Sequence, residues 1–377
     1  MVMTTFFQVS SFNNLIMYRI QFLLFLLLFN YCEAQKLNRT DLGLIVPKHP
    51  DCTPVKNQYM SSTCWSFSST SLLESELMKA GKENIDLSEM FIARYSLVRK
   101  IQRHLKLKGG NFFTPGGQFH DVSWVIKNFG MVPEEIYSGK KPGVFNHNHA
   151  DMDTIFSRFV KNCVKKGITE LSQLQNKFVD NVLDEYLGPV PGEFVYRSKT
   201  YTPYSYAEQF LGLKPDNFIE ITSYTHHPFY TKFILEDKYN WTNDEYYNVT
   251  MDDFSLITDH ALANGYTIGW DGDADDPYFD YFEGLAYLPD TIGDFQKKRQ
   301  IAFEDRSTEL DHMMHIVGVT KDMKGNKWYY IKNSWGDNSN PLGGFLFMRE
   351  DYFKIRTVAI IVNKQAIPYN IKTKMGF

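Results

Sequence analysis

The segment NQYMSSTCWSF, residues 57–67, holds a glutamine six positions before a cysteine. Cys64 stands at the start of a run with helical periodicity, so helix N–H groups and the helix dipole would stabilise its thiolate. The amide of Gln58 can donate to an oxygen that becomes negative when a thiolate attacks a carbonyl, together with the Cys64 backbone N–H. The alternative is a small buried residue at a helix start, which is common for cysteine. The Gln58 spacing favours a nucleophile.

A nucleophilic thiolate needs a base, and the base needs a group that orients it. The segment LDHMMHIVGVT offers His312 and His315, and YYIKNSWG offers Asn333 followed by Trp335. Successive side chains of a strand point to opposite faces, so only one of the two histidines can face a cleft. The side-chain oxygen of Asn333 could accept the imidazole N–H and fix its tautomer. Trp335 would keep water off that hydrogen bond.

Other motifs suggest metal ligands, but their spacing does not support a metal site. Neither the pair His226–His227 nor the pair His147 and His149 matches a zinc pattern, so we expect surface or loop histidines. The segment GWDGDADDPY lacks the glycine position and the final glutamate of a calcium loop. We interpret it as an acidic loop near the cleft, with the residues Asp271, Asp273, Asp275 and Asp276. No metal or organic cofactor is predicted.

The elements predicted to carry these residues are helices in the first part of the chain and strands in its last third. A helix is predicted over 66–80, ending at Gly81, with small residues on its early turns that allow another layer to approach. A second helix begins near DLSEM, where Asp86 and Glu89 have capping-box spacing. A third lies between Gly117 and Gly130, with His120 and Asp121 capping or lining it. Short β-rich runs fill the last third, which predicts α+β layers that meet at a cleft.

The blocks NQ…TCWSF, DHMMHIVGV and KNSWG…GGF resemble the catalytic blocks of papain-like cysteine peptidases, in which Gln, Cys, His and Asn occur in this order. The resemblance implies that Cys64 is the nucleophile, Gln58 the oxyanion donor and Asn333 the residue that orients the base. It assigns the base position to His312, because the five residues before Gly318 reproduce the family's spacing.

The segment PGG resembles the family's double-glycine stretch, which implies that Gly116 and Gly117 pair with the substrate backbone. His312 lies 248 residues after Cys64, whereas papain-type enzymes place the histidine about 130–150 residues downstream. We therefore expect a large, mostly helical insertion at about 140–250. Residues 35–57 are too few for an inhibitory propeptide. With a long insertion and no room for a propeptide, the chain resembles the bleomycin hydrolase and aminopeptidase C branch of the family, in its exported bacterial form.

The resemblance implies a papain-like, two-lobed α+β fold and a cysteine peptidase that hydrolyses peptides, with aminopeptidase activity favoured. In that branch the carboxylate of a C-terminal arm binds the substrate's amino group. Here 44 residues follow Asn333, and the tail looks shorter than the usual arm. An endopeptidase with the same mechanism and a catalytically silent peptide-binding protein therefore stay open as alternatives. Relatives in the branch form rings of six, which implies a homo-oligomer.

The first 34 residues have the pattern of an export signal. After Met17, an alternative start, come Arg19, an apolar run over 22–29 and a cleavage site after Ala34. Residues 35–377 would then form the peptidase domain, periplasmic or secreted. The run is too short to span a bilayer, and no later segment is long and apolar enough, so stable membrane insertion is not expected. A net charge of -4 without positive clusters argues against nucleic-acid partners.

Three cysteines follow the predicted cleavage site: Cys52, Cys64 and Cys163. An odd number leaves at least one thiol unpaired in an oxidising compartment. A disulfide between Cys52 and Cys163 stays open, and both are expected to be structural or inert.

Overall fold

The computed structural model describes residues 37–289 and 292–377. The chain divides into two units, residues 1–41 and residues 42–377. Of the first unit, residues 37–41 are described, and they hold the start of the short helix α2 (Arg39–Leu42). The export signal predicted for residues 1–34 lies outside the described residues and stays a prediction.

The second unit contains all the candidate site residues and most of the secondary structure. Its helices and helical turns are η1 (Tyr59–Ser61), α3 (Cys64–Lys79), α4 (Glu89–Lys106), α5 (Phe119–Phe129), α6 (Ala150–Lys165), α7 (Gln173–Leu187), α8 (Pro203–Ser205), η2 (Tyr206–Leu211), η3 (Pro215–Asn217), α9 (Met251–Ala263), α10 (Phe295–Glu304), α11 (Glu350–Arg356), η4 (Lys364–Ala366) and α12 (Tyr369–Lys374). Its strands are β1 (Phe194–Tyr196), β2 (Lys199–Tyr201), β3 (Phe218–Thr222), β4 (Lys232–Ile234), β5 (Glu245–Asn248), β6 (Ile268–Gly272), β7 (Phe279–Asp280), β8 (Leu285–Ala286), β9 (His312–Lys321), β10 (Lys327–Lys332), β11 (Phe345–Arg349) and β12 (Thr357–Asn363). No helix in the described ranges has both the length and the apolar character needed to cross a membrane.

The helix starts follow from local capping. The predicted capping box at the second helix is wrong: Ser88 is the N-cap of α4, and its hydroxyl accepts the backbone N–H of Phe91 at 3.1 Å. Asp86 instead forms an ion pair with Lys56. At α5 the expected capping role of Asp121 is confirmed, because its Oδ2 accepts the backbone N–H of Gln118 at 3.0 Å.

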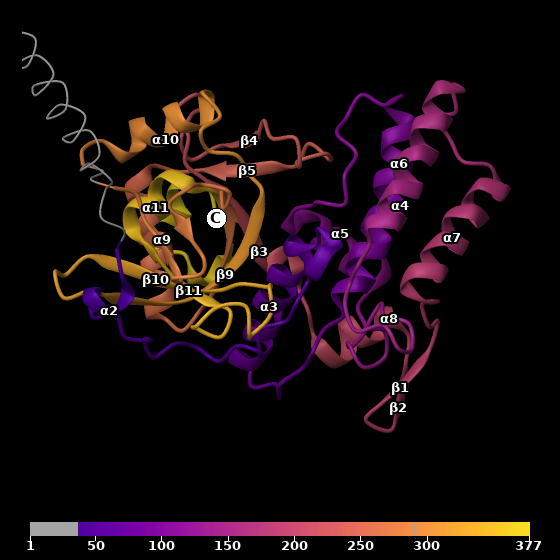
Figure 1. The fold of residues 1–377 in the computed structure, drawn as a ribbon, viewed down its shortest axis with the longest axis horizontal. Helices are drawn as coiled ribbons and strands as arrows, with labels where there is room; N and C mark the ends of the chain where they lie inside the picture. Colours follow the sequence, from indigo (N-terminus) through magenta and orange to yellow (C-terminus); the bar gives the residue numbers. More distant parts are fainter. Residues whose placement is uncertain (1–36, 290–291) are drawn as a thin grey trace, which may run out of the picture. The chain divides into compact units, whose positions relative to one another are not determined.

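One mixed sheet of ten strands has the order β4-β5-β3-β12-β6-β9-β10-β11-β8-β7. Neighbouring strands run antiparallel except in the pairs β3–β5 and β8–β11. Helices α9 and α11 pack against the sheet, while α3 to α7 gather on its other side in Figure 1. Every residue of β12 is buried, so apolar residues can fill both of its faces. The helical N-terminal part and the strand-rich C-terminal part confirm the predicted α+β fold class.

Helix α3 lies directly against strand β9, in the middle of this unit (Figure 1). The hydroxyl of Ser68 donates to the backbone carbonyl of Met314 at 2.6 Å, and the hydroxyl of Ser71 is 2.8 Å from Nδ1 of His315. As predicted, small side chains on α3 allow this close approach. Because later residues of α3 meet later residues of β9, the first residues of both elements lie at the same end of the contact. Those first residues are Cys64 and His312.

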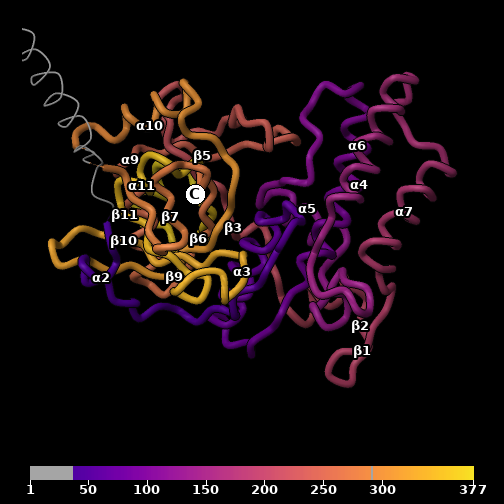
Figure 2. The backbone as a smooth tube through the Cα atoms, in the orientation of Figure 1, coloured from indigo at the N-terminus to yellow at the C-terminus, as the bar shows by residue number. Residues whose placement is uncertain are grey.

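The segment predicted as an insertion, about 140–250, begins with α6 and α7 and the hairpin β1–β2. Apolar residues of α6 and α7 recur at helical spacing and join the same core as α3, α4 and α5: Met152, Phe156, Val160, Val179, Leu183 and Leu187. The chain then returns from the helices to β3 and β5, whose positions Figure 2 labels. There β3, β4 and β5 extend the sheet beyond β12. The segment therefore contributes to both the helical part and the sheet.

Candidate active site

Cys64 is the first residue of α3 and lines a pocket of about 270 Å³. Burial raises the pKa of its thiol to about 12, and the neighbouring carboxylate of Asp271 raises it too, whereas backbone N–H groups of Met313 and Trp65 lower it. Position at the helix start led us to expect a stabilised thiolate, but burial outweighs that contribution. Although Cys64 is only partly buried by its accessible surface, its surroundings favour the neutral thiol.

His312 begins β9 and lines the same pocket as Cys64. Its Nε2 lies 2.7 Å from Oδ1 of Asn333, and its ring centroid is 4.8 Å from that of Trp335. Oδ1 of Asn333 also accepts a backbone N–H from Ser334 at 2.8 Å, so Nε2 of His312 must be the donor in the first bond. That bond assigns the proton to Nε2 and leaves Nδ1 as the unprotonated ring nitrogen.

Between the pKa of His312 and that of Cys64, both the imidazole and the thiol are neutral. Burial lowers the pKa of His312 to about 4, although the hydrogen bond to Asn333 raises it. A neutral imidazole can accept a proton from a neighbouring thiol when that sulfur becomes a nucleophile. The pair therefore has the protonation states that general-base activation requires.

Gln58 is tied to the residues that follow Asn333. Its backbone N–H donates to the carbonyl of Ser334 at 2.8 Å, and its side-chain Oε1 accepts the hydroxyl of Ser334 at 2.6 Å. A bridge between Asn57 and Trp335 holds the same two segments together. With Oε1 held by Ser334, the amide NH₂ is the end of Gln58 that remains available to the pocket it lines.

Gly116 and Gly117 line the same pocket as His312, and close contacts explain why they are glycines. A Cβ atom on Gly116 would lie 2.8 Å from the ring of Tyr239, and one on Gly117 would lie 2.9 Å from the ring of Trp65. Buried Lys100 donates to the backbone carbonyls of Thr114 and Gly116, which fixes this stretch. Any side chain here would push these groups apart, so the backbone itself forms the pocket wall.

His315 faces α3 further along β9 and does not line this pocket. Its Nδ1 bonds to Ser71 on α3, and Lys332 donates to Ser71 at 2.8 Å and to Thr53 at 2.9 Å. The strand alternation argument therefore gives the correct position for both histidines. His315 belongs to a buried polar network between α3 and the sheet.

Asp271, predicted to lie in an acidic loop, lies instead in strand β6 beside the pocket. Asp271 lines it, whereas Asp273 accepts the backbone N–H groups of Asp275 and Glu309, and Asp276 pairs with Arg356 at 2.7 Å. The loop is thus held by backbone donors and by an arginine. Sequence patterns did not indicate several residues that line the pocket, among them Tyr239 and Leu310, or Lys100 and Ser334, which support its walls. They have no distinctive spacing, because only the folded chain brings them to this region.

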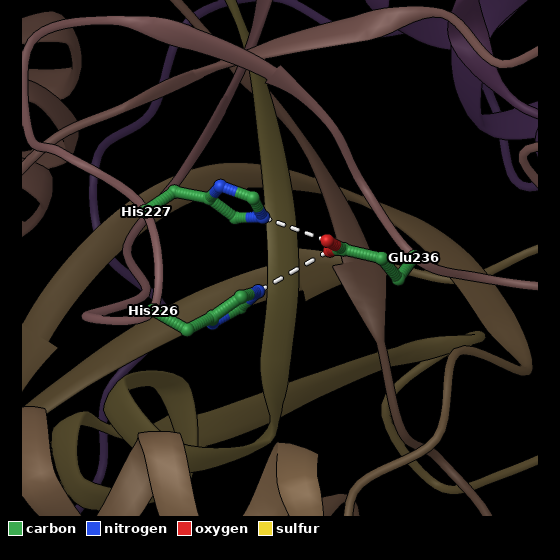
Figure 3. Close-up of side chains that lie close together, drawn as sticks. All are labelled: His226, His227 and Glu236. Atoms are coloured by element: carbon green, nitrogen blue, oxygen red, sulfur yellow. Dashed lines mark hydrogen bonds and ion pairs between the residues drawn. The ribbon is translucent and has the colours of Figure 1, made fainter.

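A histidine cluster forms at the sheet edge, away from Cys64. Figure 3 shows His226 and His227 pointing at the carboxylate of Glu236, at 3.2 Å and 2.6 Å, with all three ligand atoms within 4.8 Å of one another. Gln300 uses Oε1 to accept the backbone N–H of Thr225, so its amide donates to Nδ1 of His226 at 2.9 Å. The His226 proton must then lie on Nε2, facing Glu236. A metal at Nε2 would require the opposite tautomer, so this is a hydrogen-bonded cluster.

His147 and His149 lie in a loop, one of the two places predicted for them, but this loop is buried. Each residue is 4% exposed, and the ring centroids are 6.0 Å apart. Burial lowers the pKa of His147 to about 3 and that of His149 to about 4.

In the described part of the chain, Cys52, Cys64 and Cys163 are all free thiols, so Cys52 and Cys163 are not bridged.

Comparisons with known proteins agree with this architecture. A family model described as "Peptidase C1-like family" matches residues 31–376. Aminopeptidase E of Lactobacillus helveticus is 23% identical over 382 residues, which cover 87% of this chain and 84% of that protein. Cysteine proteinase 1, mitochondrial, of Saccharomyces cerevisiae is 22% identical over 400 residues, which cover 92% and 82%. The crystal structure of pepw from Lactobacillus rhamnosis matches with a TM-score of 0.68 and 16% identity, over 99% of this chain and 95% of that chain, and so shares the fold.

Proposed function

Because the chain belongs to the Peptidase C1-like family and is a cysteine-type peptidase, we propose that it removes residues from the N-terminus of peptides through Cys64 and His312. The family match and the shared fold confirm the predicted resemblance to papain-like peptidases. One observation carries the proposed mechanism: His312, oriented by Asn333, lines the same pocket as the thiol of Cys64.

The proposed reaction begins with both groups neutral. Sγ of Cys64 attacks the scissile carbonyl carbon while Nδ1 of His312 takes the thiol proton. The carbonyl oxygen becomes an oxyanion, which the Gln58 amide and the Cys64 backbone N–H stabilise. His312 then gives its proton to the leaving amine as the C–N bond breaks. Asn333 keeps the ring in the tautomer that both transfers need.

Hydrolysis of the acyl-enzyme uses the same residues again. Water attacks the thioester carbonyl while His312 accepts a water proton, and the same two donors stabilise the second oxyanion. The C–S bond breaks, the sulfur recovers its proton from His312, and the acid product leaves. The proposal needs no metal or organic cofactor. Export and homo-oligomer formation stay predictions.

The names of several relatives favour exopeptidase action, since three of them are described as aminopeptidases E, C and W. Tyr239, from the predicted insertion, also lines the pocket and lies against Gly116. A bulky ring there limits the room for a chain that continues beyond the pocket. An endopeptidase with the same site is the alternative.

Blocking the substrate's N-terminus separates these two activities. We expect rapid release of the fluorophore from a leucyl fluorogenic amide and little release from its N-acetyl twin, because an exopeptidase site accepts a chain that begins at the cleaved residue. The measurement is kcat/KM for both substrates with the same enzyme stock. Equal values for the pair would reject the aminopeptidase proposal and leave the endopeptidase.

The oxyanion role of Gln58 predicts a large effect on kcat. Gln58→Ala should lower kcat by roughly 10²- to 10³-fold, because one preorganised donor to the transition state is lost. Ser334→Ala should cause a smaller decrease, since it removes the hydroxyl that holds Oε1 and not the donor itself. Steady-state kinetics on the leucyl substrate give both values, and titration of Cys64 gives the active-site concentration. A Gln58→Ala enzyme with normal kcat would exclude this role.

A further inference from the structure

Asp271, on β6, brings a buried carboxylate into the pocket that Cys64 lines. The residue is 1% exposed, and in the described part of the chain its Oδ1 has no hydrogen-bond partner. An unpaired buried carboxylate is costly, because water no longer solvates it and no donor replaces the water. A ligand with a positive donor group would supply the missing partner.

The charges around Asp271 make this end of the pocket suitable for a cation. Burial raises the pKa of Asp271 well above its usual value, and three further carboxyl groups raise it more: Asp237, Glu220 and Asp311. Asp311 lines the same pocket, and burial raises its pKa to about 7. An arriving ammonium group would shift Asp271 toward its ionised form, because an opposite charge close by favours the charged state of a carboxyl group.

The size and walls of the pocket suit a short substrate segment. Its volume of about 270 Å³ is just below that of pockets for drug-sized ligands, which start at roughly 300 Å³. Tyr239 lies against Gly116, and Phe112 supports its ring edge to face with centroids 5.7 Å apart. Phe377 packs against Tyr247 on β5, with ring centroids 5.0 Å apart, and does not line this pocket. The carboxylates that line it are those of Asp271 and Asp311.

We propose that Asp271 binds the α-ammonium group of the substrate's first residue and thereby places that residue's carbonyl at Cys64. This inference rests on the proposed aminopeptidase function. The ammonium group gives Oδ1 of Asp271 a charge-assisted hydrogen bond and offsets the cost of the buried carboxylate. A blocked N-terminus cannot form this bond. A lysine or arginine side chain of the substrate carries the same charge, so the test must separate the two sources.

The decisive variant is Asp271→Asn, which keeps the shape of the side chain and removes its charge. We expect kcat/KM for the leucyl fluorogenic amide to fall by roughly 10- to 100-fold, the range for one hydrogen bond to a charged group, mainly through KM. Cleavage of the N-acetyl-leucyl twin should not fall. Asp275→Asn is the matched control, because it removes an exposed carboxylate from the loop that follows β6, and it should match the wild type on both substrates.

Three comparisons decide between the outcomes. The wild-type preference for the free amine tests the aminopeptidase function itself, and the loss of that preference in Asp271→Asn tests the anchor. A variant that keeps the full preference, with equal amounts of titratable Cys64, overturns the role of Asp271 and leaves the aminopeptidase proposal intact. N-acetyl-arginyl-leucyl and N-acetyl-leucyl-leucyl amides provide the third comparison. A loss confined to the arginyl substrate would assign Asp271 to side-chain recognition and reject the α-ammonium assignment.

Discussion

Replacement of Cys64 by alanine is expected to abolish peptide hydrolysis, with a loss on the order of 10⁵- to 10⁶-fold in kcat, the scale seen when a catalytic nucleophile is removed. The methyl group that remains cannot form the acyl-enzyme, and the pocket is otherwise unchanged. Release of fluorophore from the leucyl amide, followed for hours at high enzyme concentration, measures the residual rate. Substrate binding should persist, because the groups that line the pocket around residue 64 are still present.

Cys52 provides the matched control for this variant. It is a free and partly buried thiol, and it does not line the pocket of Cys64. Cys52→Ala should therefore keep wild-type kcat/KM and lose one titratable thiol. Near-normal turnover in Cys64→Ala would eliminate the mechanism. A wild-type protein that binds peptides without cleaving them, and whose Cys64 resists alkylation, would be the silent peptide-binding protein instead.

Much of the site follows from local rules that operate within one element. The helical period of residues 66–80 puts Cys64 at a helix start, and strand alternation separates His312 from His315. Both positions agree with the structure, where His312 lines the pocket and His315 bonds to α3. These rules work because an element's own geometry sets which of its residues share a face.

Contacts between distant segments could not be predicted in this way. Ser334 holds the Gln58 side chain across 276 positions, and Tyr239 closes on Gly116 from the segment predicted as an insertion. Burial is also a property of the whole fold. It reversed the expected shift of the Cys64 pKa, and it placed His147 inside the protein. Neither burial nor such pairings leave a local pattern in the chain.

The same distinction explains the capping error at α4. Asp86 and Glu89 have capping-box spacing, but both carboxylates bind Lys56, which also lies near Glu74. A partly buried ammonium group that contacts three carboxylates stabilises their charges more than one backbone N–H would. Ser88, between them, then becomes the cap. The tertiary ion pairs decide where the helix begins.

His312→Ala is expected to reduce kcat by roughly 10⁴- to 10⁶-fold, because the variant loses both the acceptor of the thiol proton and the donor to the leaving amine. His315→Gln should keep wild-type kcat per titrated Cys64, since His315 does not line the pocket. It should instead lower the free energy of unfolding by about 1–3 kcal/mol, as the buried bond to Ser71 is weakened, and chemical denaturation measures this. The two variants thus separate chemistry from packing within one strand. If the effects were exchanged, with His315→Gln inactive and His312→Ala active, the assignment of the base and the direction of proton transfer would both be wrong.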